Sequence, residues 1–90
     1  MLTLSEINLG LLKLKDWDLE GNAITKKFIF ENSLKVMEFV SKIVSLGNEL
    51  NHNPDITISE NIVKLTLTTK SLDSLTKKDF EMAEAIDRII

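Results

Sequence analysis

The chain has 90 residues, of which 43% are apolar and 28% are charged, with three glycines and one proline. This composition is typical of a single globular domain over residues 1–90 and excludes disordered and fibrous classes. Eleven basic against fourteen acidic residues give a net charge of -3. Because the lysines are scattered, direct nucleic-acid binding is not expected. The lack of cysteine excludes disulfides and thiolate zinc sites.

No apolar run approaches the length that spans a membrane, and no basic segment followed by a long apolar run opens the chain as in a signal peptide. We therefore expect a cytoplasmic protein that does not contact a membrane.

Residues 4–14 predict a short helix. Ser5 is a candidate N-cap, and Ile7, Leu11 and Leu14 recur at helical spacing.

Residues 16–30 predict a β-hairpin. Gly21 and Asn22 suit a two-residue turn, and β-branched and aromatic residues follow it. The apolar face of this hairpin is expected to carry Trp17, Leu19, Ile24, Phe28 and Phe30.

A change of period predicts a long amphipathic helix from Asn32 or Ser33 to about Leu46 or slightly beyond. Gly47 and several asparagines mark its end, and Pro54 prevents it from resuming. The stripe expected to face the core consists of Leu34, Val36, Met37, Val40, Ile43 and Val44.

Clean alternation of apolar and polar residues over 55–69 predicts a second hairpin that turns near Glu60. One face carries Val63, Leu65 and Leu67, and the other carries Lys64, Thr66 and Thr68. Residues 71–75 are expected to form a loop.

A capping box in which Asp79 replaces the usual glutamate, three residues after Thr76, predicts the start of a final helix. Its stripe is expected to consist of Phe80, Ala83, Ile86 and Ile90. The order of elements predicts an α+β fold: a four-stranded antiparallel sheet with two long helices packed on one face, plus a short N-terminal helix.

Polar side chains are expected to gather at one end of the second hairpin. If this hairpin pairs symmetrically about Glu60, His52 lies opposite Thr68, and Lys70 is a diagonal neighbour about 7 to 8 Å away. Imidazole exchanges protons near neutral pH, and the amide of Asn53 can bind a planar heterocycle through paired donor and acceptor bonds. These residue types indicate a small polar pocket.

Each candidate also has a structural interpretation. Asn51, Asn53 and the single histidine are common in turns before a proline. Lys70 at a strand end is usually solvated, and Asp79 in a first helical turn is favoured by the helix dipole. Trp17 in a strand is more often part of a core than a ligand platform.

Three motifs resemble those of the pterin-4a-carbinolamine dehydratase family. The family's NHHP, TTH and G-L-T-x-x-D sequences correspond to "NHNP" at 51–54, "LTLTTK" at 65–70 and "SLTKKD" at 74–79, with the spacings kept. "DWDLEGNAITKKFIF" resembles the family's tryptophan hairpin, so the resemblance covers nearly the whole chain. It implies the fold predicted above, dimers that join their sheets, and tetramers that form through helices.

The resemblance also implies dehydration of a 4a-hydroxytetrahydropterin to the quinonoid dihydropterin. It implies catalytic roles for His52, Asn53, Lys70 and Asp79, and substrate binding by a second set, Trp17, Asn51, Pro54 and Thr68. The reaction requires one proton for the leaving oxygen and removal of another from ring nitrogen N5. The pterin is the substrate, so neither a metal nor a bound cofactor is implied.

Departures from the family motifs leave an alternative open. Asn53 and Lys70 replace two family histidines: an amide cannot exchange protons, and lysine is charged at neutral pH unless its surroundings change that. Ile56, Thr57 and Glu60 replace aromatics, Asn48 replaces a charged residue and Ser74 a glycine.

The alternative is a noncatalytic relative, either a pterin binder or an oligomeric module for a protein partner, since some family members bind a homeodomain transcription factor. In either case an open sheet edge favours a homodimer at least.

Overall fold

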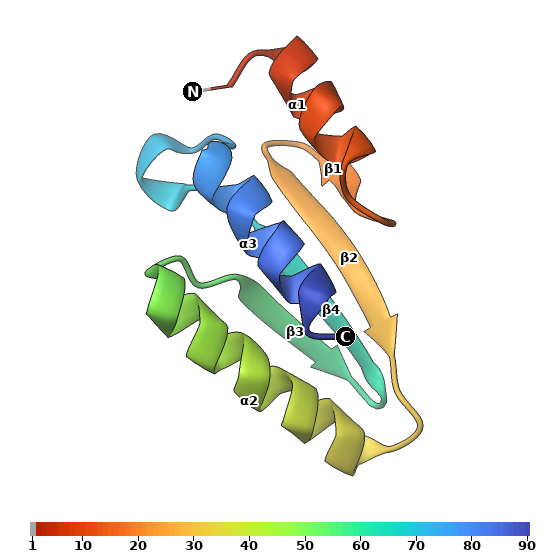
Figure 1. Ribbon diagram of the computed structural model, residues 1–90. Coiled ribbons are helices and arrows are strands. Elements are labelled where there is room, and N and C mark those ends of the chain that lie inside the picture. The colour runs from red at the N-terminus through yellow and green to blue at the C-terminus, as the bar shows by residue number, and fades with distance from the viewer. Residues whose placement is uncertain (1) are drawn as a thin grey trace.

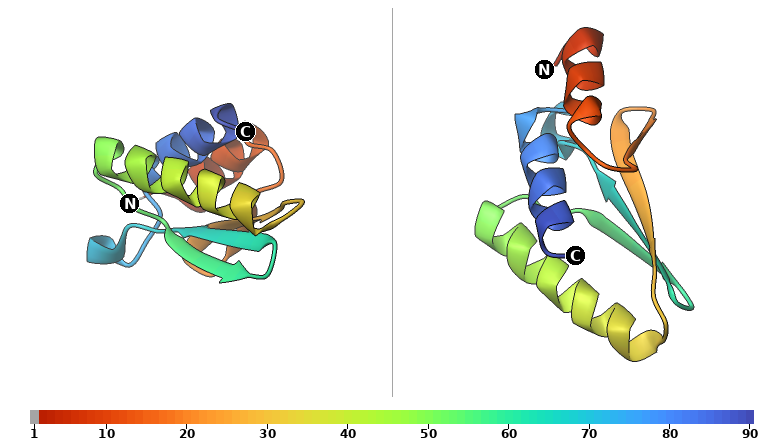
Figure 2. Two further views of the ribbon diagram at one scale, coloured as in Figure 1. Left: turned by 90° about the horizontal axis from the view of Figure 1, so that it is seen from below. Right: turned by 45° about the vertical axis from the view of Figure 1, so that its right-hand side comes forward.

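The computed structural model describes residues 2–90 and confirms the predicted α+β fold (Figure 1). Within this range the four strands form one antiparallel sheet in the order β1-β2-β4-β3. Helices α2 and α3 cover one face of the sheet, and α1 lies near the end where β1 turns into β2 (Figures 1 and 2). In chain order the elements are α1 (Leu4–Leu12), β1 (Asp18–Glu20), β2 (Ala23–Ile29), α2 (Ser33–Leu50), β3 (Asp55–Ser59), β4 (Ile62–Leu67), the 3-10 turn η1 (Lys70–Leu72) and α3 (Lys77–Arg88).

The core lies between the covered face of the sheet and the two long helices. The alternation predicted for β4 is confirmed, because Val63, Leu65 and Leu67 are fully buried. These side chains pack against buried residues of β2 and of both helices, which include Ile24, Phe28, Val36, Phe39, Ile43, Met82, Ala83 and Ile86.

Within residues 2–90, no helix has the length and apolar content of a membrane span.

The N-cap of α1 is Thr3 rather than Ser5, which lies inside the helix. The Thr3 hydroxyl accepts a hydrogen bond from the backbone N–H of Glu6 at 3.2 Å, and the Glu6 carboxylate accepts one from the backbone N–H of Thr3 at 2.9 Å. This reciprocal capping box satisfies two free N–H groups, which Ser5 could not do alone. Bonding to the backbone and then to the hydroxyl of Thr3 lowers the pKa of the Glu6 carboxyl.

Helix α2 is longer than predicted, and its buried stripe is different. Its N-cap is Asn32, whose side chain accepts from the backbone N–H of Lys35 at 3.0 Å. The prediction that Leu34, Met37 and Val44 face the core is wrong, since they are 67%, 58% and 45% exposed. Only one side of the helix meets the sheet and α3, and that side carries Val36, Phe39, Ile43 and Gly47.

The second hairpin turns between Glu60 and Asn61, so the predicted symmetry about Glu60 is wrong by one position. Asp55 pairs with Thr66, and Ser59 pairs with Ile62. A two-residue turn has its centre between residues, and Glu60 adopts the left-handed conformation with a φ of 55°. A shift of one residue in a strand moves every side chain to the opposite face, which decides which residues can reach the candidate site.

The first hairpin and the last helix agree with their predictions in most respects. Gly21 opens the turn between β1 and β2 with a φ of 62°. The capping box of Thr76 and Asp79 begins α3. Ile90, expected in the stripe of this helix, lies beyond its end and is exposed.

Candidate functional site

The turn between α2 and β3 fixes the position of His52. The backbone N–H of Asn51 donates to the carbonyl of Asn48 at 3.3 Å, and that of His52 donates to the carbonyl of Gly47 at 2.9 Å. Asn51 is left-handed, with a φ of 54°. These features define a Schellman C-cap in which asparagine replaces the more common glycine. Asn51 therefore has a backbone role here, as the structural interpretation proposed.

Asn53 and Pro54 complete this turn. Asn53 is exposed and Pro54 is buried directly before β3. A Cβ atom on Gly47 would overlap Oδ1 of Asn53 and lie 3.2 Å from its Cα. Glycine at position 47 thus lets the chain fold back closely against the last turn of α2, and this sets the position of Asn53 beside His52.

His52 is held by a fully buried carboxylate. Its Nε2 lies 2.5 Å from Oδ1 of Asp79, and the exposed side-chain fractions are 12% for His52 and 0% for Asp79. Oδ2 of Asp79 accepts hydrogen bonds from the hydroxyl of Thr69 and the backbone N–H of Thr76, both at 2.9 Å. The buried carboxylate is tolerated because both of its oxygens have hydrogen-bond partners.

The second ring nitrogen of His52, Nδ1, is not bonded to another described side chain or backbone group. Within residues 2–90, Nδ1 has no hydrogen-bond partner, and no fully buried side-chain nitrogen or oxygen lacks one, so Nδ1 is not completely buried. An ionised carboxylate only accepts hydrogen bonds, so Asp79 favours the tautomer with the proton on Nε2. Nδ1 then presents a lone pair and can accept a proton.

Lys70 and Thr68, both predicted as site residues, bond elsewhere. Nζ of Lys70 lies 2.7 Å from Oδ1 of Asp55, with side chains 68% and 56% exposed. The hydroxyl of Thr68 donates to the backbone carbonyl of Asn22 at 2.7 Å. The predicted cluster of His52, Thr68 and Lys70 depended on the register that the structure corrects.

Trp17, predicted to border the substrate, bonds to the opposite end of α3. Its indole N–H donates to the carboxylate of Asp87, at 3.1 and 3.2 Å from the two oxygens. Asp87 follows Asp79 by two helical turns, about 12 Å along the axis. Trp17 is only 6% exposed. Its packing fits the structural interpretation, and its polar contact is remote from His52.

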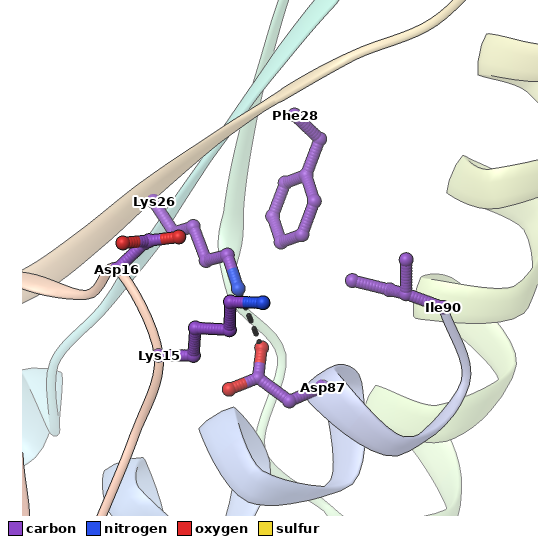
Figure 3. A pocket seen from close by; sticks show the side chains of 6 residues that line it. All are labelled: Lys15, Asp16, Lys26, Phe28, Asp87 and Ile90. Carbon is purple, nitrogen blue, oxygen red and sulfur yellow. Dashed lines mark hydrogen bonds and ion pairs between the residues drawn. The ribbon is translucent and has the colours of Figure 1, made fainter.

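A pocket of about 340 Å³ lies beside Asp87, the residue that accepts from Trp17 (Figure 3). Asp87 also pairs with Nζ of Lys26 at 2.9 Å, and that ammonium lies 5.1 Å from the ring centre of Phe28. Lys26 and Asp87 could not be recognised as partners from the sequence, because no motif links residues 61 positions apart. The lining residues are Lys15, Asp16, Lys26, Phe28, Asp87 and Ile90.

Among residues 2–90, Thr69 is the one residue that bonds to Asp79 through its side chain without having been predicted from the sequence as part of the site. It follows β4 on the same face as Leu65 and Leu67, so continued alternation would have placed it inward.

Within residues 2–90, no group of three or more His, Asp or Glu side chains is arranged to hold a metal ion.

The fold and the site together define a small α+β domain in which a buried carboxylate orients a single histidine. Residues 1–89 match the Pterin 4 alpha carbinolamine dehydratase family, so the chain belongs to that family and the resemblance in its motifs is confirmed.

Relatives of this chain carry the corresponding name in provisional form. A Sulfurisphaera tokodaii protein provisionally named pterin-4-alpha-carbinolamine dehydratase is 37% identical over 89 residues, which are 99% of this chain and 96% of that protein. A Chloroflexus aurantiacus protein with the same provisional name is 41% identical over 86 residues, which are 96% of this chain and 92% of that protein.

Two solved structures are similar to this fold. The crystal structure of a transcriptional coactivator/pterin dehydratase from Brucella melitensis has a TM-score of 0.91 at 32% identity, covering 98% of this chain and 96% of that one. A pterin dehydratase-like protein described as a RuBisCO assembly factor in the alpha-carboxysome has a TM-score of 0.66 at 19% identity, covering 81% and 84%. The second likeness shows the fold alone.

Proposed function

We propose that this protein dehydrates a pterin-4a-carbinolamine to the quinonoid dihydropterin, and that His52 transfers the proton. The observation that carries the proposal is the 2.5 Å contact between Nε2 of His52 and buried Asp79, which leaves Nδ1 without a hydrogen-bond partner among residues 2–90. Family membership supports the substrate class. The proposed location is the cytoplasm.

The reaction converts the electron pair of the N5–H bond into an N5=C4a double bond, while the C4a–O bond breaks and the hydroxyl leaves as water. In the proposed mechanism, Nδ1 of His52 accepts the proton from N5, and the carboxylate of Asp79 stabilises the imidazolium that forms. The imidazolium then gives its proton to the departing oxygen. One histidine thus serves as base and then as acid, roles that typically contribute about 10²- to 10⁴-fold each.

Asn53 and Lys70 assist the reaction in this proposal without exchanging protons. The exposed amide of Asn53 offers a donor and an acceptor to the edge of the pterin. The ammonium of Lys70 stabilises the departing oxygen, for which it must leave Asp55. An ion pair as exposed as this one is worth less than about 1 kcal/mol, so it can be exchanged at little cost.

Two measurements on the unmodified protein test this function. The first compares the dehydration rate of synthetic carbinolamine with protein and with buffer alone, and the proposal requires a clear acceleration. The second measures the thermal unfolding midpoint with a stable dihydropterin, because a ligand that binds only the folded state raises that midpoint. A raised midpoint without acceleration would indicate the noncatalytic pterin binder instead.

Exposed apolar side chains favour association between copies of this chain, which is compatible with the proposed dehydratase activity. Leu34, Met37 and Val44 recur at three- and seven-residue steps on the outer side of α2 and are 67%, 58% and 45% exposed. Strand β3 pairs only with β4 in the described sheet, so its outer backbone edge is open. We propose that further copies of this chain cover these surfaces, giving a homodimer or homotetramer.

A further inference from the structure

We infer that Thr69 is a positioning residue for the His52–Asp79 pair, an inference that rests on the proposed dehydratase function. Thr69 lies between β4 and η1. Its hydroxyl is 2.9 Å from Oδ2 of Asp79 and 2.7 Å from the hydroxyl oxygen of Thr76. It therefore acts on His52 through the carboxylate.

The direction of each hydrogen bond follows from the number of protons. An ionised carboxylate only accepts, so the single hydroxyl proton of Thr69 points to Asp79. The hydroxyl of Thr76 must then donate to Thr69. The result is a chain in which Thr76 donates to Thr69, Thr69 donates to Oδ2 of Asp79, and His52 donates to Oδ1. Hydrogen bonds in such a chain polarise one another.

The backbone around Thr69 makes this hydroxyl a fixed support. Thr69 forms an isolated antiparallel bridge with Ser74: its N–H donates to the Ser74 carbonyl at 3.0 Å, and the N–H of Ser74 donates back at 3.4 Å. The side chain is also β-branched, which restricts its rotation. The end of the central strand β4 is thereby tied to the segment that leads into α3, whose first turn carries Asp79.

Two donors on Oδ2 prevent the Asp79 carboxylate from rotating, so Oδ1 stays directed at Nε2 of His52. Without the Thr69 hydroxyl, Oδ2 keeps only the backbone N–H of Thr76. The carboxylate then has more freedom, and the preference of His52 for a proton on Nε2 weakens. The proton-transfer step slows while substrate binding is unaffected, because Thr69 reaches the reaction only through Asp79.

The experiment compares Thr69→Val, which keeps the shape and removes the hydroxyl, with Thr69→Ser, which restores the hydroxyl. Thr25→Val is the matched control. The hydroxyl of Thr25 also donates to a carboxylate, that of Glu20 at 3.2 Å, but it does so from the opposite face of the sheet. With synthetic carbinolamine, Thr69→Val should lower kcat about tenfold with KM changed less than about twofold. Thr69→Ser and Thr25→Val should remain near wild type.

A spectroscopic readout separates this inference from the proposed function. His52 is the only histidine in the sequence, so its ring nitrogen signals in NMR are unambiguous. Wild-type protein and Thr69→Ser should show the proton on Nε2, and Thr69→Val should show a larger share on Nδ1. If wild-type protein does not dehydrate carbinolamine, the proposed function fails, while these spectra still decide the role of Thr69.

Wild-type kcat and an unchanged His52 spectrum in Thr69→Val would overturn the inference. Equal losses in Thr69→Val and Thr69→Ser would also overturn it, because packing of the methyl group would then be responsible. If Thr69→Val does not fold, Thr69→Cys decides, since its weak S–H donor should give an intermediate loss of kcat.

Discussion

The Asp79→Asn substitution separates the chemistry of the buried carboxylate from its structural role. The asparagine oxygen can still accept from the Thr69 hydroxyl and the Thr76 backbone N–H, as Oδ2 does in the native protein. The new amide NH2 group then faces Nε2 of His52. That nitrogen must become an acceptor, so the ring proton moves to Nδ1. The lone pair that the proposed mechanism requires at Nδ1 is lost.

The structure indicates a small loss of stability and a large loss of rate. The contacts to Thr69 and Thr76 are kept, and the bond to His52 changes from charge-assisted, about 1.5 to 3 kcal/mol, to neutral, about 1 kcal/mol. The free energy of unfolding should fall by about 0.5 to 2 kcal/mol, from the roughly 5 to 15 kcal/mol typical of a domain. The kcat for dehydration should fall by about 10²- to 10⁴-fold.

The assay measures kcat on synthetic carbinolamine and the free energy of unfolding in urea for the same preparations. Asp87→Asn is the matched control, because Asp87 lies two turns further along α3 and accepts from Trp17 and Lys26. It should lose similar stability and keep kcat within about twofold of wild type. Asp79→Asn protein with wild-type kcat would refute the assignment of Nδ1 as the proton acceptor.

Two further substitutions test the turn before β3 and the outer face of α2. Gly47→Ala should lower the free energy of unfolding by about 1 to 3 kcal/mol despite the better helix propensity of alanine, because its Cβ overlaps Oδ1 of Asn53. An unchanged urea midpoint would show that Asn53 can move away freely. Met37→Glu should lower the native mass measured by light scattering, since a charge within the exposed stripe opposes burial against another copy. The proposed oligomer would be contradicted by wild-type protein that has the mass of a single chain.

The strands and helices could be predicted because their apolar periodicities differ and their ends carry clear turn and capping residues. The exact pairing of β3 with β4 could not, since an alternating pattern fits a turn centred on Glu60 almost as well as one between Glu60 and Asn61. This difference in strand pairing determines which side chain after β4 lies against Asp79. It places Thr69, rather than Thr68 or Lys70, beside Asp79.

The candidate site was predictable only as far as local motifs reach. The capping box placed Asp79 at the start of α3, but its contact with His52 spans 27 positions and depends on how α3 packs against the α2–β3 turn. The periodicity of apolar residues likewise predicted that α2 is amphipathic without distinguishing its two apolar stripes. One stripe faces the core and the other, with Leu34 and Met37, faces outward. Periodicity alone cannot distinguish burial in a core from burial in an assembly.

The rate of carbinolamine dehydration by His52→Gln protein tests the central claim most directly. The glutamine amide can still donate a hydrogen bond toward Asp79, but it cannot accept a proton as imidazole does. The proposed mechanism predicts that wild-type protein clearly exceeds buffer and that His52→Gln loses at least about 100-fold in kcat while remaining folded. Folded His52→Gln protein that dehydrates the substrate as fast as wild type would contradict it.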